Sequence, residues 1–184
     1  MAAPQFDKHE TALDDVFILQ RSIYTDERGS FGKIFNKETF AQLGLQPLEF
    51  RELIYSVSSN NVIRGMHWQA HPYGTAKLIS VVQGSILDVV VGIGGEHNTR
   101  NYGKTFSVEL SAANNKTLLI PDGYAHGFKS LEDNTIVVYL QSQIYSCEHE
   151  KGIHYQSFGF DWRIVDPIVS DKDQALPPLK ASAS

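Results

Sequence analysis

The hydrophobic and polar positions of this chain alternate over short stretches that Gly, Pro and Asn/Asp clusters separate. Alternation with a period of two is typical of β-strands that bury one face. The pattern predicts strands at 16–20, 30–35, 50–57, 62–68, 77–82, 85–93, 104–110, 116–120, 127–131 and 135–142. Many short strands at close spacing, with little helical periodicity, predict an all-β fold, either a sandwich or a barrel.

Local signals predict one helix and one tight turn. A helix is expected over 36–44, because Asn36 can cap its first turn and Gly44 can adopt the left-handed conformation that ends it. Gln83-Gly84 separates two of the predicted strands, and a two-residue connection that ends in Gly is typical of a β-hairpin. We therefore expect the two strands that flank this dipeptide to be hydrogen-bonded to each other.

Length and composition fit one globular domain rather than a disordered or nucleic-acid-binding chain. The 184 residues are 42% hydrophobic and 11% aromatic, which suffices for one core. We expect a single domain over 1–184, with its core at about 16–179. The net charge of −5 disfavours a nucleic-acid partner, because the phosphate backbone rewards a cationic excess. A small anionic ligand that a few local cations hold is still compatible with this charge.

The sequence carries no signal for secretion or for a membrane. Cys147 is the one cysteine, so neither a disulfide nor a cysteine-based zinc site is expected. The N-terminal residues lack the apolar core of a signal peptide, and no apolar run approaches the roughly 18–20 residues of a membrane-spanning helix. The sequence therefore predicts a cytoplasmic protein without membrane association.

Several polar residues lie inside apolar segments, where they are costly unless they are paired. His67 lies in a predicted strand, in which Gly65 would share its face and Arg64 would point the opposite way. Lys77 opens the next predicted strand, and Asp88 is embedded in the one after it. Each of these side chains can be functional, can be satisfied by a hydrogen bond in the core, or can face outward from the sheet.

A second group of candidate residues comes later in the chain. Pro121 and Gly123 predict a turn that delivers His126 to the start of a strand. Tyr139 lies in an apolar strand, which can bury its ring and still present its hydroxyl. The charged segment 170–173 would by itself be a solvated turn.

A metal site built on His67 and His71 is a minority alternative. The two residues are four apart, which on a strand places them on one face but far apart along it. No glutamate occurs between 68 and 83 to complete a ligand set, and zinc or non-haem iron needs at least three ligands. The sequence therefore favours chemistry without a metal.

Six segments that carry these residues occur in the order of a known family. They are Asp26–Phe31, Ile63–Gln69, Ala76–Ile79, Gly84 with Asp88–Val91, Ile120–Phe128 and Val169–Asp173. Together they resemble the dTDP-4-dehydrorhamnose 3,5-epimerase family, from about residue 16 to residue 179. The resemblance implies a cupin-type jelly-roll fold, a homodimer, and catalysis with neither a metal nor an organic cofactor.

The resemblance also implies a role for each matching residue. His67 is similar to the family's general base and Asp173 to the carboxylate that orients it, while Lys77 matches the lysine that faces the C4 oxygen. Tyr139 matches the tyrosine that returns a proton from the opposite face of the sugar. Substrate contacts are implied for Arg28, Phe31, Lys33, Glu52, Arg64, Gln69 and His126. Of these, the two arginines resemble pyrophosphate ligands.

The chemistry of a 4-keto sugar explains why these residue types are suitable. The hydrogens at C3 and C5 are α to the carbonyl, so an imidazole can remove one of them and form an enolate. A carboxylate that bonds this imidazole fixes its tautomer, and a lysine stabilises the negative charge on O4. Inversion needs a proton from the other face of the sugar, which a tyrosine can supply.

Three stretches depart from the family's usual residues. Lys33 stands where a Glu is common, Glu52 and Ile54 stand where Gln and Asn are common, and Gly92-Ile-Gly94 replaces Asp-x-Arg. These positions are expected to meet the base, the ribose or the phosphates, and replacing Glu by Lys turns an acceptor into a donor. The sequence therefore predicts retained epimerase chemistry with an altered nucleotide or sugar preference, for example for CDP- or GDP-linked substrates.

The expected function is an NDP-4-keto-6-deoxysugar epimerase of polysaccharide precursor synthesis, which inverts C3, C5 or both. Two alternatives use the same fold. A sugar 3,4-ketoisomerase would move the carbonyl, and a binding module would hold a nucleotide sugar or a glycan without turnover. The pair of His67 and Tyr139, a base and an acid, favours epimerisation.

Overall fold

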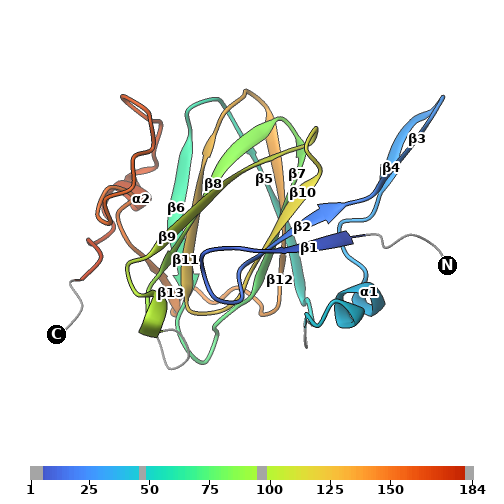
Figure 1. The fold of residues 1–184 in the computed structure, drawn as a ribbon. Coiled ribbons are helices and arrows are strands. Elements are labelled where there is room, and N and C mark those ends of the chain that lie inside the picture. The colour runs from blue at the N-terminus through green and yellow to red at the C-terminus, as the bar shows by residue number, and fades with distance from the viewer. Residues whose placement is uncertain (1–5, 46–48, 95–98, 181–184) are drawn as a thin grey trace.

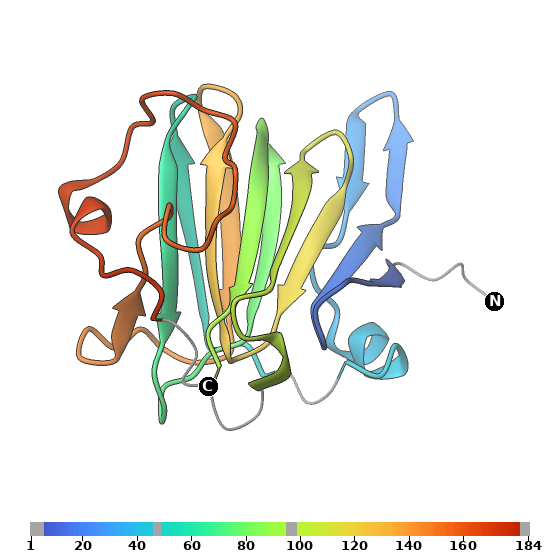
Figure 2. The ribbon, with the colours of Figure 1, turned by 60° about the vertical axis from the view of Figure 1, so that its left-hand side comes forward.

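Two antiparallel sheets face each other and form a β-sandwich (Figure 1; Figure 2). The computed structural model describes residues 6–45, 49–94 and 99–180. The six-stranded sheet has the order β1 (Phe6–Glu10), β2 (Phe17–Arg21), β10 (Lys116–Ile120), β7 (Lys77–Gln83), β12 (Thr135–Gln141) and β5 (Glu52–Ser58). The five-stranded sheet has the order β13 (Glu150–Gly152), β6 (Ile63–Gln69), β11 (Tyr124–Ser130), β8 (Ser85–Gly92) and β9 (Thr105–Ser111). The predicted all-β class is therefore confirmed.

Three smaller features surround the sandwich. A hairpin of β3 (Ile23–Asp26) and β4 (Gly29–Gly32) extends away from it (Figure 1). The helix α1 (Lys37–Gln42) lies near the N-terminal strands, and a 3₁₀ turn spans Thr99–Asn101. The short helix α2 (Asp171–Gln174) belongs to a C-terminal segment on the side of the five-stranded sheet (Figure 2). No helix in the described ranges is long and apolar enough to span a membrane.

Apolar side chains fill the space between the sheets and also cover the outside of the five-stranded sheet. Ile79 and Val90 belong to the core between the sheets, to which both sheets contribute. On the outer side, Trp162 of the C-terminal segment packs in a cluster with Met66 and Val89. This second cluster attaches the C-terminal segment to the sandwich, because burying a large apolar side chain stabilises the packed state by about 1.5–3 kcal/mol.

Most of the elements expected from the pattern are present. Every predicted strand overlaps an observed one, although β4 ends at Gly32 and β11 starts earlier, at Tyr124. The helix is confirmed, since Asn36 Oδ1 accepts a hydrogen bond of 2.8 Å from the Thr39 amide and Gly44 has φ +74°. The strands β1, β3 and β13 and the helix α2 were not expected, because they are short and lack a long periodic pattern.

The predicted hairpin at Gln83-Gly84 is wrong. β7 pairs with β10 and β12, whereas β8 pairs with β9 and β11 in the other sheet. Gly84 has φ +73°, and a side chain there would collide with Thr135. The turn therefore carries the chain from one sheet to the other, so that two strongly apolar strands can bury their inner faces on the same core from opposite sides.

Candidate active site

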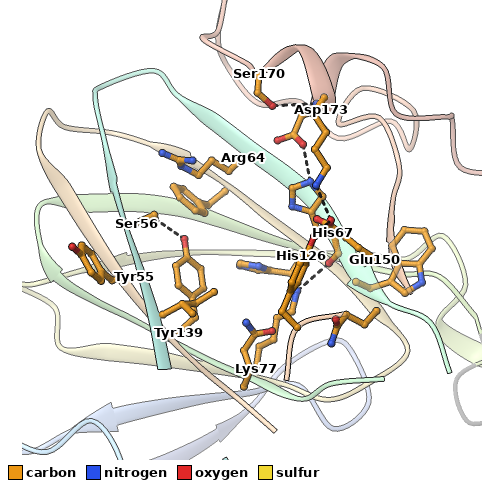
Figure 3. A pocket seen from close by; sticks show the side chains of 17 residues that line it. Tyr55, Ser56, Arg64, His67, Lys77, His126, Tyr139, Glu150, Ser170 and Asp173 are labelled. Atoms are coloured by element: carbon orange, nitrogen blue, oxygen red, sulfur yellow. Dashed lines mark hydrogen bonds and ion pairs between the residues drawn. The ribbon is translucent and has the colours of Figure 1, made fainter. Parts of the chain in front are cut away.

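A pocket of about 390 Å³ lies between the two sheets and contains most of the polar residues that the sequence singled out (Figure 3). Both sheets and the start of α2 contribute to its walls. The lining residues are Ile54, Tyr55, Ser56, Arg64, His67, Trp68, Gln69, Lys77, His126, Phe128, Tyr139, Gln141, Tyr145, Glu150, Ser170, Lys172 and Asp173.

A bulge in β6 brings two of these residues to the same side of their strand. His126 and Phe128 of β11 are two positions apart, but they lie opposite His67 and Arg64, which are three apart. The extra residue breaks the alternation, so Arg64 and His67 both line the pocket and the expected opposite orientation of Arg64 is wrong. Gly65 makes this possible with φ +115°, a conformation that residues with a side chain rarely adopt.

His67 and Asp173 form a hydrogen-bonded pair at the pocket wall. His67 Nε2 lies 2.7 Å from Asp173 Oδ1, and Asp173 Oδ2 accepts a hydrogen bond of 3.0 Å from the Gly65 amide. Ser170 caps α2 by accepting from the Asp173 amide, which holds this buried carboxylate over β6. Burial opposes ionisation of Asp173, but the hydrogen bonds from His67 and Gly65 outweigh it, so the pKa of this carboxyl is lowered.

Lys77 brings a half-buried cation to the pocket. It opens β7, and its Nζ donates a hydrogen bond of 3.1 Å to the His67 carbonyl. Burial lowers the pKa of Lys77 to about 8, although the negative charges of Asp88 and Glu150 oppose this shift. The amine is therefore mostly protonated at neutral pH and loses its proton around pH 8.

A second histidine–carboxylate pair lies deeper in the sandwich. His126 Nε2 is 2.8 Å from Asp88 Oδ2, and the Asp88 side chain is fully buried on β8. Asp88 Oδ1 has no hydrogen-bond partner in the described structure. Burial raises the pKa of Asp88, while His126 and Lys77 act in the opposite direction. The sequence had left the role of Asp88 open, and the structure pairs it with a pocket histidine.

Tyr139 belongs to β12 and lies in the wall that β12 forms with β5. Arg64 of β6 lies next to this wall. The Tyr139 hydroxyl lies 2.8 Å from Ser56 Oγ, and burial raises the pKa of this phenol well above its usual value. Arg64 donates to Ser58 Oγ at 3.0 Å and to the Val57 carbonyl at 3.1 Å. In Figure 3, Tyr139 and His67 lie on opposite sides of the cavity, with Lys77 below both.

The hairpin β3–β4 carries predicted substrate ligands that lie outside this pocket. Arg28 binds Asp26 through its Nε and Nη2 atoms, and Phe31 is 67% exposed. Both residues line a separate hollow on the hairpin, and Lys33 follows β4 at an exposed position. None of these three residues lines the pocket between the sheets of the same chain.

Glu52 and Gln69, two further predicted ligands, have different surroundings. Gln69 lines the pocket, but its amide binds the main chain at Tyr73, Ile144 and Ser146, so it holds neighbouring loops in place. Glu52 is not among the lining residues. Its Oε2 atom is buried and has no hydrogen-bond partner in the described structure.

The sequence reasoning missed a polar cluster at the pocket wall. Glu150 Oε2 accepts hydrogen bonds from the Tyr145 hydroxyl at 2.6 Å and from Lys172 Nζ at 2.7 Å. Burial acts against ionisation of Glu150, but the bonds from Lys172 and Tyr145 lower its pKa. A signal existed for Lys172, which lies directly before Asp173 in a segment that had been interpreted as a solvated turn.

The geometry supports proton transfer from two sides of a small molecule. A hydrogen-bonded imidazole lies on one wall, a phenol on the other, and the half-buried amine of Lys77 lies near both. Within the described ranges, no group of three or more His, Cys, Asp or Glu side chains is arranged to hold a metal ion.

Comparisons with known proteins agree on one family. The sequence model of dTDP-4-dehydrorhamnose 3,5-epimerase matches residues 10–181. A protein of that name from Shigella flexneri is 37% identical over 166 residues, which cover 89% of this chain and 91% of the relative. A crystal structure of the Bacillus anthracis dTDP-4-dehydrorhamnose 3,5-epimerase with TDP and PPi bound has a TM-score of 0.89 and 35% identity, over 95% of this chain and 99% of that one. The Legionella pneumophila dTDP-6-deoxy-D-glucose-3,5-epimerase in complex with dTDP-4-keto-L-rhamnose has a TM-score of 0.89 and 32% identity, over 95% and 93% of the two chains.

Proposed function

The chain belongs to the dTDP-4-dehydrorhamnose 3,5-epimerase family, and we propose that it inverts C3 and C5 of a dTDP-linked 4-keto-6-deoxyhexose. The observation that carries this proposal is the placement of His67 and Tyr139 on opposite sides of one pocket, with Lys77 near both (Figure 3). The relatives with TDP and with dTDP-4-keto-L-rhamnose bound support the choice of nucleotide.

His67 is the base. Because the pKa of Asp173 is lowered, its carboxylate is ionised near neutral pH and holds the imidazole proton on Nε2. The lone pair is then on Nδ1, which removes the proton from C3 or C5. The positive charge that this step creates on His67 is stabilised by Asp173, 2.7 Å away.

Lys77 stabilises the enolate. Removing a proton next to the carbonyl moves negative charge onto O4, and a preplaced cation in a buried site lowers the barrier to this step. His126 lies next to the same part of the pocket, with Asp88 bound to its Nε2. We propose that His126 makes a polar contact with the substrate and that Asp88 holds the imidazole of His126 in one orientation.

Tyr139 completes the inversion. Its hydroxyl gives a proton to the enolate carbon from the face opposite His67, so the configuration at that carbon changes. The burial that raises the pKa of Tyr139 keeps the phenol protonated until a strongly basic carbon is available. Arg64 carries a fixed positive charge at the same pocket and binds the pyrophosphate, for which a guanidinium is well suited.

The active unit is a dimer. β5 is an edge strand of its sheet, and its outward residues Leu53, Tyr55 and Val57 are 65%, 70% and 50% exposed. A contiguous apolar strip on an edge strand favours packing against a second copy. The hairpin that carries Arg28 and Phe31 extends from the sandwich (Figure 1). We infer that in this dimer it contributes to the pocket of the other subunit.

The test follows hydrogen exchange on the substrate. Incubation with dTDP-4-keto-6-deoxyglucose in D₂O should place deuterium at C3 and C5 and yield the inverted sugar, as NMR can show. His67→Ala should abolish exchange, whereas Tyr139→Phe should keep exchange and lose inversion. Saturable binding without any exchange would instead indicate a binding module, and a carbonyl at C3 would indicate a ketoisomerase.

The nucleotide preference needs its own comparison. Lys33, Glu52 and Ile54 depart from the family's usual residues, and the altered preference inferred from them stays a prediction. The same assay with CDP-, GDP- and UDP-linked sugars at equal concentration decides it. A higher kcat/KM for any of these than for the dTDP-linked sugar would overturn the choice of dTDP while keeping the epimerase chemistry.

A further inference from the structure

Ser56 contacts the proposed proton donor and has no role in the mechanism above. Its Oγ lies 2.8 Å from the Tyr139 hydroxyl, and both side chains line the pocket (Figure 3). β5 and β12 are paired in register, with Ile54 opposite Tyr139, so Ser56 lies two positions further along the same face of β5. The sheet itself therefore holds the two hydroxyl groups at hydrogen-bond distance.

Tyr139 needs a partner after it has given its proton away. Donation leaves a phenolate in a place where burial disfavours charge, and this burial is the largest cause of the raised pKa of Tyr139. The hydrogen bond from Ser56 acts most strongly in the opposite direction, followed by the positive charge of Arg64, while Asp88 adds to the increase. Ser56 is thus the group in direct contact that makes the phenolate less costly.

A neighbouring serine shows that the contact is specific to its position. Ser58 follows Ser56 by two residues, but its Oγ accepts a hydrogen bond of 3.0 Å from Arg64 Nε. The two serines therefore share a strand and a residue type, and they differ in the side chain that they hold. Ser58 provides a matched control for Ser56.

We propose that Ser56 is a positioning residue, whose hydroxyl holds Tyr139 for proton donation, stabilises the phenolate, and relays the proton that restores the phenol. The inference rests on the proposed function. Ser56 is only half-buried, so its hydroxyl can also meet water. A hydroxyl both donates and accepts hydrogen bonds, which a relay requires.

The proton balance of the cycle closes without any further reactant. One sugar C–H bond breaks and its proton goes to His67 Nδ1, and one new C–H bond forms with the proton of the Tyr139 hydroxyl. The product has the composition of the substrate, and the enzyme holds an imidazolium and a phenolate. To reset it, Ser56 passes its proton to Tyr139 and takes one from water, while His67 releases one proton to water.

The experiment compares Ser56→Ala and Ser56→Thr with the wild-type protein on dTDP-4-keto-6-deoxyglucose in D₂O. Two rates are measured by NMR: deuterium incorporation into unreacted substrate and formation of inverted product. Ser56→Ala should slow product formation about tenfold, which is the size expected for a lost hydrogen bond to a charged group, and should leave exchange within about twofold. Ser56→Thr, which keeps the hydroxyl, should restore the wild-type ratio of the two rates.

The controls separate this role from a general loosening of the pocket. Ser58→Ala should raise KM through Arg64 and leave the ratio of exchange to inversion unchanged. In a Tyr139→Phe background, Ser56→Ala should have no further effect on exchange. An unchanged ratio in Ser56→Ala would overturn the role of Ser56 alone, whereas a wild-type protein that neither exchanges nor inverts the sugar would overturn the proposed function as well.

Discussion

Charged residues within apolar strands are the most informative single residues of this protein. Lys77 and Asp88 lie on consecutive strands that are mostly apolar, and each loses hydration on folding. Removal of a charge from water is costly unless the charge is paired. A charged side chain within an apolar strand therefore indicates either a specific partner or a functional role. Both residues reach the same pocket region, Lys77 directly and Asp88 through His126.

The protonation state of Lys77 should limit activity at alkaline pH. The cation is the form that stabilises an enolate, and burial has lowered the pKa of Lys77 to about 8. We therefore expect kcat/KM to fall about tenfold per pH unit above pH 8. Initial rates between pH 6 and 10, with circular dichroism as a control for folding, measure this. A profile that stays flat up to pH 9.5 would contradict the role of Lys77.

Replacing the same lysine should stabilise the protein while it inactivates the enzyme. The pKa of Lys77 falls from 10.5 to about 8 on folding, and each unit corresponds to about 1.4 kcal/mol. Lys77→Met should therefore raise the free energy of unfolding at pH 7 by about 1–2 kcal/mol, after the loss of the hydrogen bond to His67 is included.

The pH dependence of this gain has a definite sign. Below pH 8 the folded and unfolded proteins both hold the Lys77 proton, so the buried charge has its full cost. Between pH 8 and 10.5 the folded protein has released the proton, and the advantage of Lys77→Met should shrink. Urea denaturation at pH 7 and pH 9.5 tests this, and a variant that is less stable than the wild type at pH 7 would refute it.

Among the elements, β6 shows how one irregular strand builds a site. Its bulge turns Arg64 and His67 toward the same cavity, and the close approach of Gly65 to β11 makes the bulge possible. A Cβ on Gly65 would lie 2.7 Å from Gly127 Cα and 2.8 Å from the His126 carbonyl oxygen. The backbone of these two strands therefore leaves no room for a side chain.

Gly65→Ala should accordingly be severely destabilising. The strained φ of +115° and the clash with β11 together should lower the free energy of unfolding by about 2–4 kcal/mol. Gly29 is a matched control, because it has φ +119° but nothing within 4 Å of an added Cβ. Urea denaturation of Gly29→Ala should show only the smaller cost of the backbone conformation, about 1–2 kcal/mol. Equal losses in the two variants would show that the clash is unimportant.

At the scale of the whole molecule, the structure separates residues that the proposed function requires together. The pocket contains the acid–base groups, while Arg28 and Phe31 lie on a hairpin that extends from the sandwich. In the proposed dimer, the exposed apolar strip of Leu53, Tyr55 and Val57 would contact the second copy. A dimer in which the hairpins are exchanged accounts for both observations.

Mixing two inactive variants tests this arrangement. A heterodimer of Arg28→Ala and His67→Ala has one pocket in which His67 and Arg28 of the partner subunit are both intact. An equal mixture after dissociation and reassembly should therefore recover about a quarter of the wild-type activity. The control mixture of His67→Ala with Asp173→Ala should stay inactive, because both changes lie in one pocket. No recovery in the first mixture, with a dimer confirmed by light scattering, would place Arg28 outside the partner's site.

The sequence by itself determined the class of elements and the type of chemistry. Alternation and capping are local properties, so they predicted the strands and the helix at Asn36, and the motif order identified the imidazole, amine and phenol of the pocket. The same local signals failed at Gln83-Gly84, because the partner of a strand depends on residues far away in the chain.

Only the tertiary structure decided how these residues meet. Asp173 is 106 positions from His67, and the four-residue helix that carries it is too short to be stable without tertiary contacts, such as those with β6. The bulge at Gly65, the pairing of Asp88 with His126 and the contact of Ser56 with Tyr139 likewise arise from strand register. Periodicity along a chain reports which face of a strand is buried, whereas register and sheet order are set by packing between distant segments, and these decide which side chains share a pocket.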